Sequence, residues 1–310
     1  MSDAPAPVVA AIDVGTQSTR LLVSNAHGEL LRRSVITHLG RGVSERRSFD
    51  PQQLVATLDT LRAFRRDMDD LGVTHARGIS TEAVRLAADP SLFLRPASEV
   101  LRFDLELISG TQEGCLAFDG ATAGLDQADA PFVTIDLGGG SCEFALGTDH
   151  CEQVFSATFG ASVLTEAYIE HDPPRPEELL AALSIVQAHI DEVARVIPEL
   201  RDAGSFIGLG GTFSTMAAVE IGLADHDRDA VNGFLLTRSA AEDVFRTLVT
   251  ESYADRLHNP GLDPARARTI VGGSCAVVAI MRYFGLDAVR VSEADLLDAI
   301  VSDLLHDPRN

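Results

Sequence analysis

The feature that most constrains the fold is a ten-residue pattern that occurs twice in the chain. Residues 12–21 read IDVGTQSTRL, and residues 135–144 read IDLGGGSCEF. In each copy an apolar run ends in Asp, an aliphatic residue and Gly follow, and a Ser precedes the next apolar residues. This order predicts a buried strand, a tight glycine turn and a second strand. Two such copies, one domain length apart, indicate a duplicated unit, with two ordinary hairpins as the alternative interpretation.

The repeated turn also has a chemical meaning. A strand that ends in Asp13 or Asp136 presents a carboxylate at its tip, where it can hold a magnesium ion or the waters around it. Glycine leaves the backbone N–H groups open to an anion, because no Cβ stands in the way. Each copy therefore predicts a turn that binds phosphate next to a carboxylate.

Two copies predict an α/β fold of two duplicated lobes, with the ligand in the cleft between them. The pattern resembles the actin, Hsp70 and sugar-kinase group, whose lobes are actin-like (ribonuclease H-like). We place the lobes at residues 1–125 and 126–310, because Gly, Ala, Thr and Asp crowd in the stretch Gly120–Pro131. The last predicted helix, Ala294–Leu305, could pack back on the first lobe.

Helix signals lie between the predicted strands. Asp50 and Pro51 are an N-cap and a first helical residue, and an amphipathic stretch follows as far as Gly72. Residues 177–200 show the same helical spacing of apolar residues. A third glycine turn, at residues 206–212, precedes another helical stretch, so its amides could receive an anion.

The composition excludes several chemistries. All 25 basic residues are arginine, so a Walker-A lysine, a Schiff-base lysine and a kinase-type lysine are absent. Guanidinium groups instead offer planar forks that suit phosphate. The net charge is −21, and −18 of it falls in residues 126–310. This acidity argues against nucleic acid as a partner.

The sequence also predicts the cellular location of the protein and the redox state of its cysteines. It contains no apolar run long enough to span a membrane and no signal peptide at its start, which predicts a cytoplasmic protein with no membrane partner. The four cysteines stand singly, without a CxxC pair, and we interpret them as reduced thiols. A homodimer remains open.

One further stretch narrows the function. Residues 105–114, LELISGTQEG, break an apolar run at Ser-Gly and then bring Glu113 into what looks like the first turn of a helix. Alone this is only a helix start. With the hairpins, however, it resembles the exopolyphosphatase / guanosine pentaphosphate phosphohydrolase family, whose pattern here is I-S-G-x-E/D-E-A/G. Other family motifs are matched in order by residues 12–22, 80–85, 135–143, 208–212 and 292–298.

The resemblance implies roles for individual residues. Glu113 corresponds to the catalytic carboxylate that orients or deprotonates the attacking water, and Arg85 to a residue that neutralises the phosphate chain. Asp136 and Glu143, supported by Asp13, correspond to ligands of Mg²⁺ (or Mn²⁺). The implied phosphate-binding residues are Thr16, Ser18, Gly138, Gly139, Gly140, Ser141, Gly210, Gly211 and Thr212. A structural interpretation of Arg85 is a solvated charge on a helix.

Four positions depart from the family pattern. Gln17 replaces the usual Asn, Gln112 stands where Glu or Asp usually precedes the catalytic Glu, and Glu82 replaces Ser in A-T-S-A-x-R. Arg268 stands where the family often has Asp, which puts any role of that carboxylate in doubt. None of these changes removes the presumed catalytic group.

These observations predict a hydrolase, an exopolyphosphatase that releases orthophosphate from the end of inorganic polyphosphate. The chain ends without the extra C-terminal domains of long family members, and its acidic second lobe would repel a polyanion, so short chains are favoured. Arginines 41, 46 and 47 could attract the substrate. The alternatives are a guanosine pentaphosphate phosphohydrolase acting on guanosine penta- or tetraphosphate, a non-catalytic sensor of these ligands, and a kinase of the same superfamily.

Overall fold

The structure is a computed structural model that describes residues 7–307. The chain forms two compact units. Unit 1 comprises Met1–Leu116 and Leu296–Asn310, and unit 2 comprises Ala117–Asp295. Helix α5, Gly110–Thr122, runs across the division between them.

Unit 1 contains a five-stranded sheet in the order β3-β2-β1-β4-β5. Strands β1, β2 and β3 form an antiparallel meander, and β4 and β5 continue the sheet parallel to β1. The strands are β1 Val9–Val14, β2 Ser18–Asn25, β3 Gly28–Ile36, β4 His75–Ser80 and β5 Leu105–Leu107.

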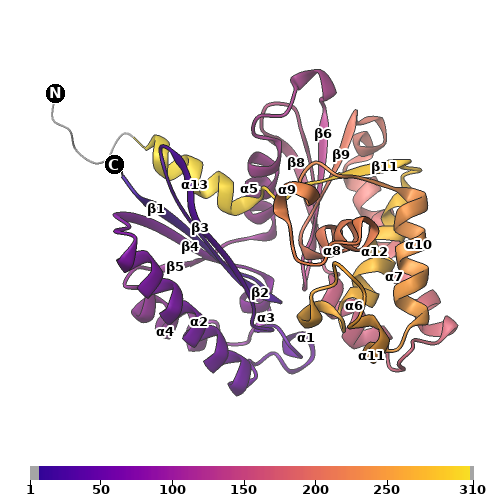
Figure 1. The fold of residues 1–310 in the computed structure, drawn as a ribbon, viewed down its shortest axis with the longest axis horizontal. Helices are drawn as coiled ribbons and strands as arrows, with labels where there is room; N and C mark the ends of the chain where they lie inside the picture. Colours follow the sequence, from indigo (N-terminus) through magenta and orange to yellow (C-terminus); the bar gives the residue numbers. More distant parts are fainter. Residues whose placement is uncertain (1–6, 308–310) are drawn as a thin grey trace. The chain divides into compact units, whose positions relative to one another are not determined.

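Helices cover both faces of this sheet. Figure 1 shows α2 and α4 against one face and the C-terminal helix α13 against the other, where α13 contacts β1 and β2. Because both faces are covered, every residue of β1 is buried. The helices of unit 1 are α1 Val43–Arg46, α2 Pro51–Asp70, α3 Glu82–Leu86, α4 Ser91–Leu101 and α13 Leu296–His306.

Unit 2 contains a six-stranded sheet in the order β10-β11-β9-β6-β7-β8. Its strands are β6 Phe132–Leu137, β7 Cys142–Gly147, β8 Cys151–Ala157, β9 Ser205–Leu209, β10 Leu235–Thr237 and β11 Ala288–Val291. Its helices are α6 Ala161–Tyr168, α7 Pro176–Val196, α8 Gly211–Ile221, α9 Arg228–Val231, α10 Arg238–Thr250, α11 Tyr253–Arg256 and α12 Ile270–Tyr283.

The two sheets share one topology. The meander β6, β7, β8 in unit 2 matches β1, β2, β3 in unit 1, and the parallel strands β9 and β11 match β4 and β5. Strand β10 is an addition to unit 2, antiparallel to β11. The prediction of a duplicated α/β fold with two lobes is confirmed.

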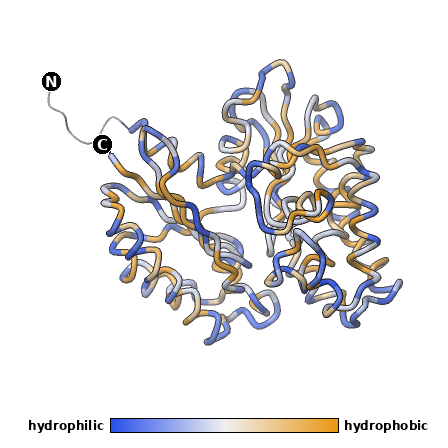
Figure 2. Tube along the Cα trace, viewed as in Figure 1, coloured by the Kyte–Doolittle hydropathy of each residue, from blue (hydrophilic) through white to orange (hydrophobic). Residues whose placement is uncertain are grey.

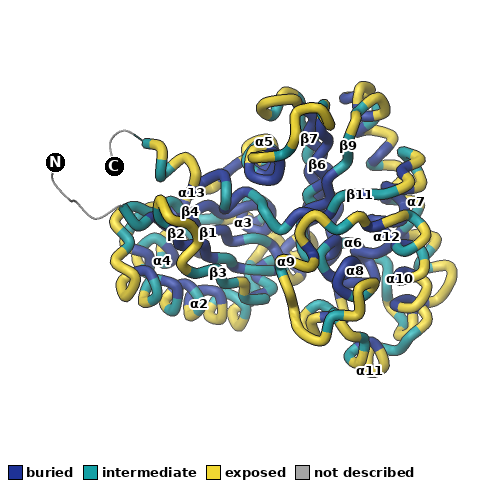
Figure 3. The backbone as a smooth tube through the Cα atoms, turned by 45° about the horizontal axis from the view of Figure 1, so that its top comes forward, coloured by how far each residue is buried: buried dark blue, intermediate teal, exposed yellow. Residues whose placement is uncertain are grey.

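Each unit has its own apolar core. The core of unit 1 lies between the sheet and helices α2 and α4, with Phe64 and Phe93 among its largest buried side chains. The core of unit 2 surrounds β6 and β7, which Figure 3 draws as buried, and includes Phe144 and Phe213. Helix α10 at the edge of unit 2 alternates between hydrophobic and hydrophilic residues in Figure 2, as expected of a helix with one face on the core, whereas α12 is buried almost throughout.

Local sequence signals account for the helix starts. The Asp50 side chain accepts hydrogen bonds from the backbone N–H groups of Gln52 and Gln53, so it is the predicted N-cap of α2. The predicted helix over residues 177–200 is α7, which ends at Val196 and is followed by a short 3₁₀ turn at Pro198–Asp202. The predicted last helix is α13.

The expectation of four reduced thiols is wrong for two of the cysteines. Cys142 and Cys275 are free and buried, whereas Cys115 and Cys151 are disulfide-bonded. Burial raises the pKa of the Cys275 thiol to about 12, which keeps it protonated at neutral pH. The sequence contains no CxxC pair that would indicate a disulfide. The bonded state of Cys115 and Cys151 is seen only in the tertiary structure.

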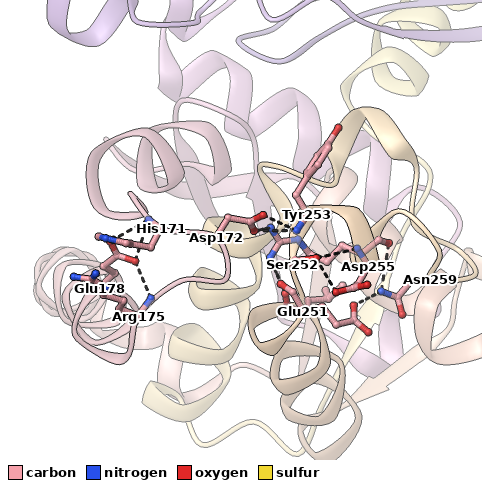
Figure 4. A network of polar contacts seen from close by, with 11 residues as sticks. His171, Asp172, Arg175, Glu178, Glu251, Ser252, Tyr253, Asp255 and Asn259 are labelled. Atoms are coloured by element: carbon pink, nitrogen blue, oxygen red, sulfur yellow. Dashed lines mark hydrogen bonds and ion pairs between the residues drawn. The ribbon is translucent and has the colours of Figure 1, made fainter.

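A network of polar groups joins loops in unit 2 (Figure 4). Arg256 is buried and donates hydrogen bonds to the carbonyl oxygens of Leu248 and Glu251 and to the carboxylate of Asp172. Asp172 also accepts from the backbone N–H of Tyr253. These bonds attach the loop before α7 to the α10–α11 corner.

At the start of α7, Glu178 serves as a helix cap. Its carboxylate accepts hydrogen bonds from the backbone N–H groups of Glu170, His171 and Arg175 and contacts the His171 ring at 2.7 Å. Oxygen and nitrogen atoms of Glu170, His171 and Glu178 lie within 4.8 Å of one another, but these contacts are those of a capping box rather than of a metal site.

Among residues 7–307, no helix is both long and apolar enough to cross a membrane.

The Glu178 cap should make unit 2 sensitive to acid. Burial of the carboxyl opposes ionisation, but the bonds from His171 and from three backbone N–H groups outweigh it and lower the pKa of Glu178 to about 2. Its stabilisation is complete above the unfolded pKa of about 4.3 and is lost as the pH falls toward 2. We expect Glu178→Gln to lower the free energy of unfolding at pH 7 by up to about 3 kcal/mol, and less at pH 3.

Denaturant unfolding at both pH values measures this difference. Glu177→Gln, at an exposed neighbouring position, is the matched control and should change stability little at either pH. An equal loss for Glu178→Gln at pH 7 and pH 3 would contradict the role of its charge.

Candidate functional site

The two predicted glycine turns have the same backbone structure. In unit 1 the N–H of Gly15 donates to the carbonyl oxygen of Ser18 over 2.9 Å, and in unit 2 the N–H of Gly138 donates to Ser141 over 3.0 Å. Each bond closes the connection between the first two strands of its sheet. The repeated sequence pattern is therefore a repeated hairpin.

In unit 2 the hairpin places two carboxylates opposite each other. Asp136 of β6 and Glu143 of β7 are direct cross-strand partners, so their side chains lie on the same face of the sheet. Glu143 is buried and accepts a hydrogen bond from Ser156 on β8 over 2.7 Å. Burial first, and then the charges of Glu143 and Asp136, raise the pKa of the Cys142 thiol well above its usual value.

The glycine turn of unit 2 lies against two other segments. A Cβ on Gly210, at the end of β9, would come within 2.5 Å of the Leu137 carbonyl oxygen and 3.2 Å of Asp136 Oδ1. A Cβ on Gly160, just before α6, would lie 2.5 Å from the backbone of Gly139. Such close approaches leave no room for a side chain at Gly160 or Gly210. The glycine turn therefore packs directly against the start of α6, and Asp136 lies beside the start of α8.

The start of α8 is covered by side chains from later in the chain. The guanidinium group of Arg266 occupies the space where a Cβ on Gly211 would lie. Thr212 is buried, and its Oγ1 lies 2.5 Å from where a Cβ on Gly273 of α12 would be. Thr212 thus packs against α12, and Arg266 brings a positive charge to the glycine turn at Gly210 and Gly211.

In unit 1 the equivalent hairpin carries opposite charges. Asp13 of β1 and Arg20 of β2 are direct cross-strand partners, and Arg20 donates to Asp13 Oδ2 from Nε over 3.0 Å and from a terminal nitrogen over 2.7 Å. Thr16 is buried beneath Gly40, and Ser18 is half-buried at the start of β2. The side chain of Arg20 thus supplies a cation to Asp13 within the hairpin.

Glu113 lies in the first turn of α5. Ser109 and Gln112 form a reciprocal cap before it: the Ser109 N–H donates to Gln112 Oε1 over 3.0 Å, and the Gln112 N–H donates to Ser109 Oγ over 3.2 Å. Gln112, which departs from the family pattern, therefore has a local structural role. The Glu113 side chain is only 11% exposed.

Arg85 of α3 lies between two carboxylates. One terminal nitrogen donates to Glu113 Oε2 and to the carbonyl oxygen of Ile108, each over 2.9 Å. Nε donates to Glu82 Oε2 over 2.8 Å. Burial works against the charged guanidinium, but Glu113 and Glu82 outweigh it and raise the pKa of Arg85 above its ordinary value. The interpretation of Arg85 as a solvated helix charge is wrong.

The predicted site residues thus fall into groups within the two units. Unit 1 brings Arg85 to Glu113 and holds Asp13, Thr16 and Ser18 in or beside the hairpin turn. Unit 2 brings Asp136 and Glu143 together with Gly138, Gly139, Gly140, Ser141 and Gly210, followed by Gly211 and Thr212. Arg268 stacks over the Tyr253 ring, 5.7 Å from its centroid.

Sequence reasoning missed three contributors to these groups. Arg20, Ser156 and Arg266 each contact a predicted site residue. Arg20 could have been found, because the hairpin register places it opposite Asp13. Arg266 could not, since its contact with Gly211 joins segments far apart in the sequence.

Known proteins resemble this chain along nearly its whole length. The Ppx/GppA phosphatase family matches residues 22–307. The chain belongs to this family.

The protein named exopolyphosphatase 2 of Mycobacterium tuberculosis is 32% identical over 313 residues, which cover 96% of this chain and 98% of that one. A crystal structure described as an exopolyphosphatase-like protein is 29% identical and superimposes with a TM-score of 0.92, covering 96% and 98% of the two chains. The PPX-GPPA enzyme of Aquifex aeolicus is 26% identical with a TM-score of 0.80, covering 96% and 99%.

Membership in the Ppx/GppA phosphatase family confirms the recognition made from the sequence motifs. It also confirms the prediction of an enzyme, a hydrolase that acts on phosphoanhydrides. The family match contains the hairpin of unit 2, Arg85 and Glu113, whereas the hairpin turn of unit 1 lies just before its first residue.

The close approach of Gly160 to the glycine turn generates a test. Gly160→Ala should displace the backbone at Gly139, and phosphatase kcat/KM should fall by about 10²-fold, the usual effect of a misplacement of about 1 Å at a site. Gly204→Ala is the matched control, because its Cβ would lie 2.8 Å from another backbone oxygen of unit 2, that of Asp129. Equal losses of activity in both variants would attribute the effect to folding rather than to the turn.

Proposed function

We propose that this protein is an exopolyphosphatase, which hydrolyses the terminal phosphoanhydride of inorganic polyphosphate and releases orthophosphate. The observation that carries the proposal is Glu113, a carboxylate held by Arg85 in the first turn of α5 at the position of the family's catalytic Glu. Support also comes from the relative in Mycobacterium tuberculosis, which is named an exopolyphosphatase and is matched over 98% of its length.

In phosphoryl transfer the protein chiefly positions the reacting groups and neutralises the charge of the phosphate oxygens. In the proposed reaction Glu113 accepts a proton from the attacking water, and Arg85 neutralises phosphate oxygens. The amides of Gly138, Gly139 and Gly140 and the hydroxyl groups of Ser18 and Ser141 bind the chain, as do the turn at Thr16 and the segment Gly210, Gly211 and Thr212. Arg266 adds a guanidinium to that segment. No covalent intermediate is needed.

The residues of unit 2 fit a divalent cation. Asp136 and Glu143 are carboxylates directly opposite each other in the sheet, and like charges in such a pair are destabilising. Oxygen ligands of this kind suit Mg²⁺ or Mn²⁺. When bound, such an ion supplies charge neutralisation and polarises phosphate oxygens. Asp13 stays a predicted supporting ligand, although Arg20 already gives it a cation.

Short polyphosphate is the favoured substrate. Residues 126–310 carry −18 of the net charge, which disfavours a long polyanion that must run along the surface. Arginines 41, 46 and 47 are exposed in unit 1 and could attract the chain. Guanosine pentaphosphate is the second candidate substrate, because the family that the chain belongs to includes both Ppx and GppA phosphatases.

The catalytic role of Glu113 is tested by Glu113→Gln, which preserves size and removes basicity. We expect kcat for tripolyphosphate to fall by roughly two to four orders of magnitude, while tripolyphosphate binding is kept or tightened because a negative charge is lost. Phosphate release from tripolyphosphate, long polyphosphate, guanosine pentaphosphate and ATP, beside a binding isotherm, measures both effects.

Glu106→Gln is the control, because Glu106 is an exposed carboxylate of unit 1 that pairs with Arg77. Turnover by Glu113→Gln within threefold of the wild type would place the base elsewhere. Faster release from guanosine pentaphosphate than from tripolyphosphate would favour the second substrate.

The metal assignment predicts a requirement for a divalent cation. Chelation with EDTA should abolish turnover, and Glu143→Gln should raise the Mg²⁺ concentration for half-maximal activity by at least about tenfold, because one charged ligand is lost. Glu152→Gln, on an exposed position of β8, should leave that concentration unchanged. Full activity in excess EDTA would show that the assignment is wrong.

A further inference from the structure

Glu82 is a departure from the family pattern that the proposed reaction does not use. It opens α3, and its side chain is only 11% exposed. Its Oε2 accepts from Arg85 Nε over 2.8 Å and lies 2.7 Å from a terminal nitrogen of the same guanidinium. The other terminal nitrogen donates hydrogen bonds to Glu113 and to the Ile108 carbonyl oxygen. Two carboxylates therefore share one arginine.

These contacts limit the number of N–H groups with which Arg85 can donate hydrogen bonds to a phosphate chain. The terminal nitrogen that faces Glu82 is buried and makes no hydrogen bond of good geometry. It can donate to a phosphate only if the guanidinium turns away from Glu82. The three side chains together carry a net charge of −1, so a polyanion that approaches them meets a carboxylate excess rather than a free cation.

We propose that Glu82 is a positioning residue that holds Arg85 on Glu113 and weakens, without abolishing, the contact of Arg85 with phosphate, an inference that rests on the proposed function. Coupled charges of low exposure influence one another strongly. While Glu82 holds the Nε side of the guanidinium, the other side stays directed at Glu113 and orients that carboxylate. Glu82 therefore raises the rate of the bound complex and lowers the affinity for substrate.

This role predicts an unusual pair of changes. In Glu82→Gln, Arg85 loses one anionic partner and turns toward phosphate, so KM for tripolyphosphate should fall about three- to tenfold, the order expected for one charge at a partly buried site. Arg85 then orients Glu113 less firmly, so kcat should fall about tenfold. A loosened fold would not tighten substrate binding, whereas loss of a positioning carboxylate would. Glu82→Asp, which keeps the charge, should restore values near those of the wild type.

The experiment is steady-state kinetics with tripolyphosphate, beside binding isotherms and thermal unfolding of each variant. Glu106→Gln again removes an arginine-paired carboxylate of unit 1 and should leave kcat and KM within about twofold. In an Arg85→Ala background, Glu82→Gln should have no further effect on KM, because it acts through Arg85. If Glu82→Gln proves unstable, Glu82→Ser, the residue of the family pattern, replaces it.

The outcomes separate this inference from the proposed function. An unchanged or raised KM in a folded Glu82→Gln protein, or an equal effect with and without Arg85, would overturn the role of Glu82 while phosphate release by the wild type still stands. If the wild type releases no orthophosphate, the proposed function fails. Tighter tripolyphosphate binding by Glu82→Gln would then still support the restraint of Arg85, because a binding isotherm needs no turnover.

Discussion

The constraint on which the candidate site depends most is the register of two antiparallel hairpins. A hydrogen bond from glycine N–H to serine carbonyl closes each turn and fixes which residue stands opposite the aspartate. A slip of one residue would send these side chains to the other face of the sheet. With the same register, Asp13 meets Arg20 in unit 1, whereas Asp136 meets Glu143 in unit 2. The same backbone register therefore places opposite charges together in one unit and two carboxylates together in the other.

Because every basic residue is arginine, the cation beside Glu113 is a guanidinium group. Arg85 uses separate nitrogens for Glu82, Glu113 and the Ile108 carbonyl oxygen, which the planar fork of a guanidinium permits. A lysine ammonium in its place could not keep the same division of contacts. Glu113 is thus paired with an arginine from another helix, and the opposite side of that arginine contacts Glu82.

Local features were predictable because neighbours in the sequence create them. The hairpins follow from apolar runs that end in Asp and Gly, and Asp50 caps α2 through contacts with residues two and three positions later. The family motifs also led to Glu113 and Arg85. The role of Gln112 as part of a helix cap was not predicted from the sequence. In the structure its side chain turns back to Ser109 and completes the cap of α5. The disulfide-bonded states of Cys115 and Cys151 were likewise missed, since single cysteines give no pairing signal.

The sequence by itself determined the duplicated α/β lobes, the two glycine turns and the family, because each depends on periodicity or on short motifs. Only the tertiary structure decided which charges meet. The pairing of Arg85 with Glu113 depends on the parallel strands β4 and β5, which bring α3 beside the start of α5, and the placement of Arg266 over Gly211 depends on packing between distant segments. Electrostatic partners are chosen by distances between side chains, and those distances exist only after the sheets and helices have packed.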